Sequence, residues 1–113
     1  MKLTIQRQKW LHGEGPDNSF LLRPDDGKMC CLGFYALALG ANPHDIENEC
    51  NPHNVYGVFG NAEWLLQSSD VDSDDACRLM HANDQTRPTL SEIDRETVIR
   101  DIFAKHGVTV EFV

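Results

Sequence analysis

An apolar run from Cys30 to Leu39, CCLGFYALAL, most limits how this chain can fold. Because the run is apolar on every side, it predicts a buried helix over about Lys28–Leu39 rather than an amphipathic surface helix. Gly33 within a helix costs about 1 kcal/mol relative to alanine, so we expect another segment to pack closely against it. Gly40 suits the left-handed residue that ends a helix.

Alternating polar and apolar residues predict a strand at each end of the chain. In KLTIQRQKW, Leu3 and Ile5 fall on one face. At the C-terminus, VTVEFV places Val108, Val110 and Phe112 on one face. We expect the two terminal strands to be neighbours. FLLR predicts a further short strand, and PDDG a reverse turn after it.

The second half of the chain predicts helices separated by loops. The segments are ANPHDIENECNPHNVYGVFG as a loop, NAEWLLQSS as a short helix capped by Asn61, DVDSDDACRLMHAN as a second helix, and TLSEIDRETVIRDIFAKHG as the best-defined helix. In the second helix, one face would carry Ala76, Leu79, Met80 and Asn83. The best-defined helix begins at a capping box, either Thr89 with Glu92 or Ser91 with Asp94, and ends at Gly107. Its apolar stripe is Ile99, Ile102 and Phe103.

These elements predict one α+β domain over residues 1–113, long enough to bury its own core. We expect three to four helices packed on a small sheet that includes the N- and C-terminal strands. No apolar stretch reaches the roughly 18–20 residues of a membrane span, and the N-terminus lacks the apolar segment of a signal peptide. We therefore predict a cytoplasmic protein with no membrane association.

The charge balance points to a particular class of partner. The chain contains ten Lys and Arg residues and eighteen Asp and Glu residues, which gives a formal charge of −8. This acidity disfavours direct nucleic-acid binding, because negative charges repel the phosphate backbone and the basic residues are scattered singly along the sequence. The same acidity favours a partner with a basic surface. The densest acidic cluster predicts the partner-binding residues Asp70, Asp72, Asp74 and Asp75. We expect a helix N-terminus there, capped by Asp72 or Ser73, and no calcium loop, because Asp75 and His81 replace the required Gly and Glu.

The four cysteines are Cys30, Cys31, Cys50 and Cys77, and without an export signal we expect them to be reduced. We interpret Cys30 and Cys31 as core residues in the first turn of the buried helix. The alternative is a zinc-stabilised domain that uses Cys50 and His53, a Cys-x-x-His pair, with one or more of Cys30, Cys31 and Cys77. A less favoured alternative is a cysteine-dependent enzyme. A helix N-terminus lowers a thiol pKa, but apolar burial raises it. We therefore predict no enzyme, no metal and no cofactor.

The stretch LLRPDDGKMCCLGFYALALGA, followed by CRLMHANDQ and FAKHGVTVEFV, resembles a group of uncharacterised small phage and prophage proteins. The shared pattern is a polar turn, Cys-Cys-Leu-Gly, an apolar run, and Leu-x-x-x-Asn-Asp before a final helix. The matching residues here are Gly27, Cys30, Cys31, Leu32, Gly33, Leu79, Asn83 and Asp84. The resemblance covers the chain from about Phe20 to the end, and it implies a phage or prophage origin and a bacterial cytoplasm. It supplies no catalytic residues.

Together, charge and resemblance predict an accessory protein that binds another protein. It would present an acidic face to a basic surface of a host or phage protein, and could inhibit a host defence or nucleic-acid-binding protein as anti-restriction and anti-CRISPR proteins do.

Overall fold

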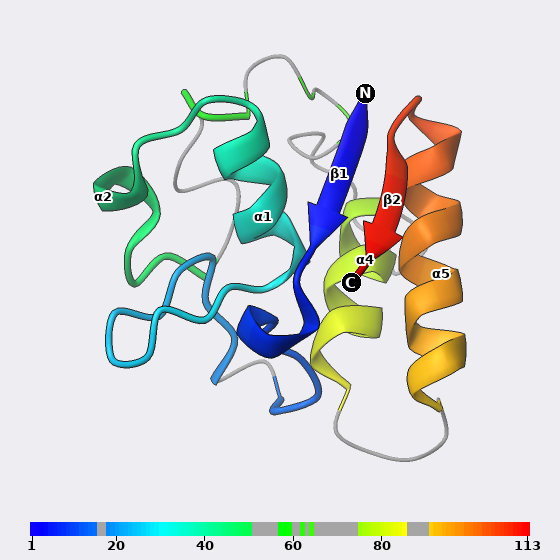
Figure 1. Ribbon diagram of the computed structural model, residues 1–113, viewed down its shortest axis with the longest axis horizontal. Helices are drawn as coiled ribbons and strands as arrows, with labels where there is room; N and C mark the ends of the chain where they lie inside the picture. Colours follow the sequence, from blue (N-terminus) through cyan, green and yellow to red (C-terminus); the bar gives the residue numbers. More distant parts are fainter. Residues whose placement is uncertain (16–17, 51–56, 60–61, 63, 65–74, 86–90) are drawn as a thin grey trace.

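The computed structural model describes residues 1–15, 18–50, 57–59, 62, 64, 75–85 and 91–113. Its elements are β1 (Lys2–Ile5), η1 (Arg7–Lys9), α1 (Cys31–Ala38), α2 (Pro43–Ile46), α4 (Asp75–Asp84), α5 (Glu92–Lys105) and β2 (Thr109–Phe112). The predicted α+β fold is confirmed: helices pack on a small sheet formed by the two terminal strands (Figure 1). In the part of the chain that the structure describes, no helix is long and apolar enough to cross a membrane.

The two terminal strands are neighbours, as expected, and they run parallel. Leu3 lies opposite Val110 and Ile5 opposite Phe112, and these four side chains are buried. The residues between them are exposed, which confirms the alternating pattern. The first strand is shorter than KLTIQRQKW, because it ends at Ile5 and a single 3-10 turn, η1, follows.

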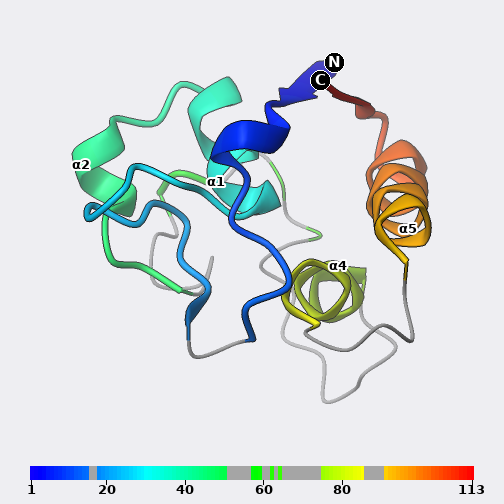
Figure 2. The ribbon, with the colours of Figure 1, turned by 60° about the horizontal axis from the view of Figure 1, so that its bottom comes forward.

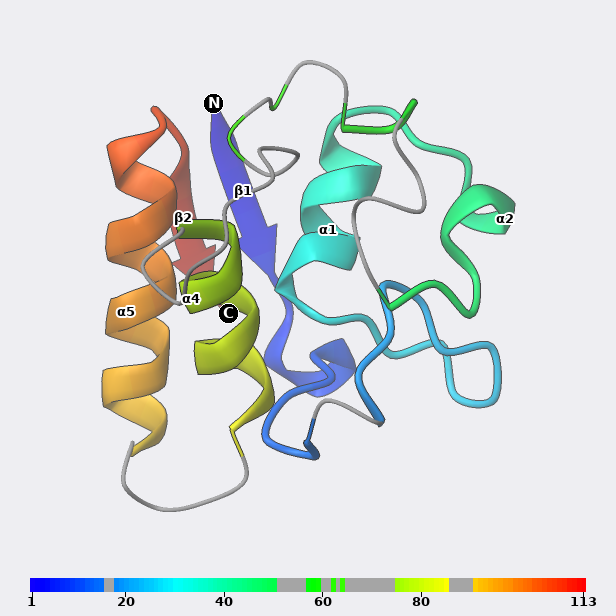
Figure 3. The same cartoon turned by 180° about the vertical axis from the view of Figure 1, so that it is seen from behind.

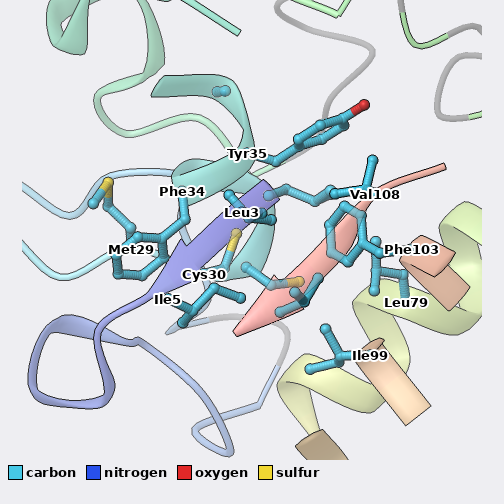
Figure 4. Packing of buried hydrophobic residues seen from close by; sticks show 14 of the residues in the cluster. Leu3, Ile5, Met29, Cys30, Phe34, Tyr35, Leu79, Ile99, Phe103 and Val108 are labelled. Carbon is cyan, nitrogen blue, oxygen red and sulfur yellow. The ribbon is translucent and has the colours of Figure 1, made fainter. Parts of the chain in front are cut away.

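The helices lie on one side of the sheet and enclose the core with it. α1 contacts β1, α5 contacts β2 and α4 contacts α5. Figures 2 and 3 show α4 on the side of the sheet that α1 and α5 also flank. Figure 4 shows how Leu3 and Ile5 of β1 face Val108, Phe103 and Ile99 across this core. The predicted apolar stripe of α5 is confirmed, since Ile99, Ile102 and Phe103 are buried.

α1 is buried on all sides over Cys31–Ala36, as its composition predicts. Gly33 is required by close packing, because a Cβ atom there would lie 1.8 Å from the carbonyl oxygen of Leu21. The segment before α1 therefore crosses directly over the helix. Gly40 has a φ of +95°, and the N–H groups of Gly40 and Ala41 donate to Leu37 and Ala36, so the helix ends as predicted.

α5 begins and ends at the predicted residues. Ser91 is the N-cap, and its hydroxyl oxygen accepts a hydrogen bond from the Asp94 N–H at 3.1 Å. Gly107 has a φ of +79°, and the next residue, Val108, donates its N–H to the carbonyl of Phe103 at 3.0 Å. This left-handed ending turns the chain directly into β2.

Two of the sequence predictions are wrong. The segment after Gly40 is not all loop, since Pro43–Ile46 forms the single-turn helix α2. Asn42 caps it by accepting the N–H of His44, and proline at the first helical position is pre-shaped for a helix. FLLR forms no strand, because only Leu22 makes an isolated bridge, to Glu47, before the chain turns at Arg23.

The remaining helix predictions are tested only in part. The helix over 61–69, with its Asn61 cap, lies outside the described residues except at Ala62 and Trp64. The cap at Asp72 or Ser73 also lies outside them. α4 itself is present, with Leu79 and Asn83 on its buried face as predicted.

The close approach at Gly33 gives a stability prediction. A Gly33→Ala variant should lower the free energy of unfolding by about 3 kcal/mol or more, because the added methyl group would meet backbone rather than a movable side chain. Gly57→Ala is the matched control, since nothing lies within 4 Å of a Cβ atom there, and its effect should be about 0.5 kcal/mol or less. Urea denaturation measures both, and equal midpoints for the two variants would contradict the packing account.

Candidate functional site

Asn83, at the C-terminal end of α4, uses all of its hydrogen-bonding capacity in the protein interior. Its side-chain oxygen accepts the indole N–H of Trp10 at 2.8 Å and the backbone N–H of Cys31 at 3.0 Å. Its side-chain nitrogen donates to the carbonyl of Leu11 and to the carboxylate of Asp84, both at 3.0 Å. Asn83 is 1% exposed. One side chain therefore joins α4 to the segment after η1 and to the start of α1.

The contact with Cys31 replaces a local cap on α1. The N-cap residue Cys30 makes no side-chain cap hydrogen bond, although the first N–H groups of a helix lack partners within it. The Asn83 oxygen accepts one of these N–H groups from a different helix. The Cys-Cys-Leu-Gly and Asn-Asp motifs thus meet at one place, and their contacts there are structural.

We call Asn83 and the residues that it binds the Asn83 junction. Arg95 of α5 binds backbone carbonyls at the same end of α4. It is 3% exposed, and its guanidinium donates to the carbonyls of Ala82, Asn83 and Gln85 at 2.8, 3.1 and 2.8 Å. These carbonyls lie at the C-terminal end of α4, where acceptors lack partners within the helix and the helix dipole favours a positive charge. Arg95 therefore caps α4 and connects it to α5. Sequence reasoning missed this role because Arg95 falls among ordinary charged residues of an exposed helix.

Asp84 is the titratable group of the junction. Burial raises the pKa of its carboxyl, and this outweighs hydrogen bonds from Ser19 and Asn83 and the charges of His81 and Arg95, which act in the opposite direction. The backbone carbonyl of Asp84 also accepts the N–H of Gly15 at 2.8 Å. Hydrogen bonds therefore fix both the side chain and the backbone of Asp84.

Cys30 and Cys31 are buried thiols, as the core interpretation predicts. Burial raises the pKa of Cys30 to about 12, although the N–H groups at the start of α1 act to lower it. Burial also raises the pKa of Cys31 well above the ordinary value for a thiol. A nucleophilic cysteine needs the thiolate form, so this environment opposes the cysteine-enzyme alternative.

The structure describes some of the ligands that the zinc alternative would use. Cys50 is exposed whereas Cys30 and Cys31 lie in the core, and His53 lies outside the described residues. Among the described His, Cys, Asp and Glu residues, no group of three gathers as metal ligands would. The Cys50–His53 pair therefore stays a prediction.

The predicted acidic cluster is described only at its last residue, because Asp70, Asp72 and Asp74 lie outside the described part of the chain. Asp75 is bound to three basic side chains of its own chain. Its carboxylate accepts from His106 at 2.9 Å, from Lys105 at 3.1 Å and from Arg78 at 3.2 Å. The contacts with His106 and Lys105 lower the pKa of Asp75. This carboxylate ties α4 to the end of α5, and its role in partner binding stays a prediction.

A second set of carboxylates lies on α2, on the segment that follows it and on the turn after Arg23, where the sequence predicted no site. This α2 surface consists of Asp25, Asp45, Glu47 and Glu49. The segment after α2 lies against the segment before α1, since the Leu21 N–H donates to Glu49 and the Asn48 N–H to Leu22. In the described part of the chain, Asp25, Asp45 and Glu49 form no ion pair. Glu47 lies 3.6 Å from His44, an ion pair only when that histidine is protonated.

The Asn83 junction gives a second stability prediction. Asn83→Ala should lower the free energy of unfolding by about 3 kcal/mol or more, because the buried N–H groups of Trp10 and Cys31 would lose their acceptor. Asn18→Ala is the matched control, since the side chain of Asn18 is exposed and, among the described residues, donates one hydrogen bond, to the carbonyl of Glu14. Chemical denaturation followed by tryptophan fluorescence measures both, and a loss no larger than that of the control would refute the role of Asn83.

Thiol reactivity tests the burial of the cysteine pair. With N-ethylmaleimide in native buffer, Cys50 should be modified while Cys30 and Cys31 react only in denaturant, because Cys50 is exposed whereas Cys30 and Cys31 are buried. Peptide mapping by mass spectrometry identifies the modified positions. Rapid modification of Cys30 or Cys31 in the folded protein would restore the cysteine-enzyme alternative.

Comparison with protein-family models, with curated proteins and with solved structures finds no match for this chain. The roles of its residues therefore rest on the geometry described above.

Proposed function

We propose that the protein is a non-enzymatic accessory factor of a phage or prophage that binds another protein through acidic surface groups. The partner would be a host or phage protein with a basic surface, such as a defence protein or a nucleic-acid-binding protein. The observation that supports this proposal is the α2 surface, where the carboxylates of exposed and half-buried residues outnumber the basic groups of the described residues nearby in the sequence.

The charge balance near the α2 surface is clearly negative. The described residues between Gly13 and Cys50 carry six carboxylates, of Glu14, Asp25, Asp26, Asp45, Glu47 and Glu49, against the two basic residues Arg23 and Lys28. Arg23 is already paired with Asp26 at 2.6 Å and with Glu14 at 3.2 Å. Asp25, Asp45 and Glu49 have no ion partner among the described residues, which leaves their carboxylates for basic groups of another protein.

The motif residues support a binding role rather than a catalytic one. Asn83 and Arg95 have their donors and acceptors directed at the protein interior, and Cys30 and Cys31 are buried. Their contacts give the domain a fixed scaffold on which surface charges keep their spacing. Such charges act mainly by raising the association rate and by penalising partners of the wrong sign, and salt screens both effects.

Charge reversal tests this proposal. An Asp45→Lys/Glu49→Lys variant should capture its main partner from phage-infected bacterial lysate at least about tenfold less well than the unaltered protein at low salt, because attraction becomes repulsion. The captured proteins are quantified by mass spectrometry over a salt gradient. For the unaltered protein, capture should weaken steadily as salt rises.

Asp94→Lys/Asp101→Lys is the matched control. It reverses two exposed carboxylates on α5, and Asp94 lies near the start of its helix as Asp45 does. Capture by this variant should be nearly unchanged. Asp70→Lys/Asp72→Lys tests the cluster that the sequence predicted. Equal capture by the unaltered protein and by both the α2 and the Asp70/Asp72 variants would refute an acidic binding surface.

A further inference from the structure

The start of the chain has the opposite charge to the rest. Residues 1–12 contain Lys2, Arg7 and Lys9 and no acidic residue, in a chain with a formal charge of −8. The basic residues look scattered in the sequence, but the fold places Arg7 of η1 and Arg100 of α5 at the same ring, that of Phe112. The terminal strands and α5 lie side by side in Figures 1 and 3.

The two arginines meet at the ring of Phe112 in β2. The guanidinium carbon of Arg7 lies 5.9 Å from the ring centroid, and that of Arg100 lies 5.6 Å from it. Phe112 itself is 7% exposed, and Trp10 packs against it at a centroid distance of 4.9 Å. An aromatic ring attracts a guanidinium, so a buried ring holds both cations in place at the surface. We call this group the Arg7–Phe112–Arg100 cluster.

One carboxylate, that of Glu96, neutralises part of the cluster. Arg7 binds it through two hydrogen bonds, from Nε at 2.8 Å and from Nη2 at 2.7 Å. These hydrogen bonds lower the pKa of Glu96, and the charges of Arg100 and His12 add to the effect. Both arginines therefore act on the same carboxylate.

Hydrogen-bond donors remain free in the cluster. Arg100 is exposed, and among the described residues none accepts a hydrogen bond from it or pairs with it. Arg7 uses Nε and Nη2 for Glu96, so its Nη1 is also left for another acceptor. A guanidinium is planar and always charged, and its donors match the oxygens of phosphate in pairs.

We propose that the Arg7–Phe112–Arg100 cluster is a binding site for a phosphate group, with Arg100 as the main hydrogen-bond donor and Arg7 as the neighbouring charge. A phosphate offers more oxygens than one guanidinium can fill, which suits a cluster with free donors on two arginines. A carboxylate ligand would repeat the contact that Glu96 of the chain itself already makes with Arg7. The overall charge of −8 opposes long polyanions, so the ligand class is a small phosphate rather than a nucleic acid.

Titration of the full chain with inorganic phosphate, followed by 1H–15N NMR, tests the site. Phosphate should shift the side-chain Nε–H signal of Arg100 and the amide signal of Phe112 in a saturable way, with a dissociation constant on the order of millimolar, as expected for an exposed site. Sodium chloride and sodium acetate at matched ionic strength should give smaller shifts that do not saturate.

Substitutions decide whether the cluster carries the binding. Arg100→Gln should weaken phosphate binding by at least about tenfold, and Arg100→Lys should lie between, because it keeps the charge but loses the paired donors. Arg78→Gln is the control, since Arg78 is an exposed arginine of α4 that is already paired with Asp75. The proposal is wrong if phosphate gives no saturable shift, if acetate gives the same one, or if Arg100→Gln binds phosphate as well as the control.

Discussion

The four hydrogen bonds of Asn83 are the constraint on which the rest of this fold depends. A buried amide that lost these partners would cost several kcal/mol, so the segments that supply them must stay together. They come from the stretch after η1, from the first turn of α1 and from α4, which are far apart in the sequence. Arg95 adds α5 by capping the same end of α4. The small parallel sheet is thereby backed by helices whose ends are fixed to one another, which matters because two short strands are not stable alone.

This arrangement separates the residues that build the domain from those that face other molecules. The cysteine pair, Asn83 and Arg95 direct their chemistry inward. Among the described residues, the charged groups at the surface have opposite signs in different places, with the carboxylates of the α2 surface in one and the two arginines at Phe112 in another. If the domain binds another protein through these charges, as we propose, its binding should weaken as salt rises.

Local patterns in the sequence were sufficient to predict the terminal strands, the buried helix α1 and the limits of α5, because alternation, apolar composition and capping residues act within a few positions. The close approach behind Gly33 could also be predicted, since glycine inside a helix is costly without a packing reason. The Asn83 junction could not, because each of its partners looks ordinary in its own segment. α2 was missed although Asn-Pro is a helix start signal, and the meeting of Arg7 with Arg100 arises only from the pairing of the two ends.

Native-state hydrogen exchange of the Trp10 indole N–H and the Cys31 amide N–H tests most directly whether Asn83 organises the fold. Both hydrogens bond to the same side-chain oxygen. If the junction is as central as the geometry indicates, both should exchange only by global unfolding, with the same free energy and denaturant dependence as the amides of the α5 core. Exchange of either hydrogen through a local opening of much lower free energy, while the α5 core stays protected, would show that the fold does not depend on Asn83.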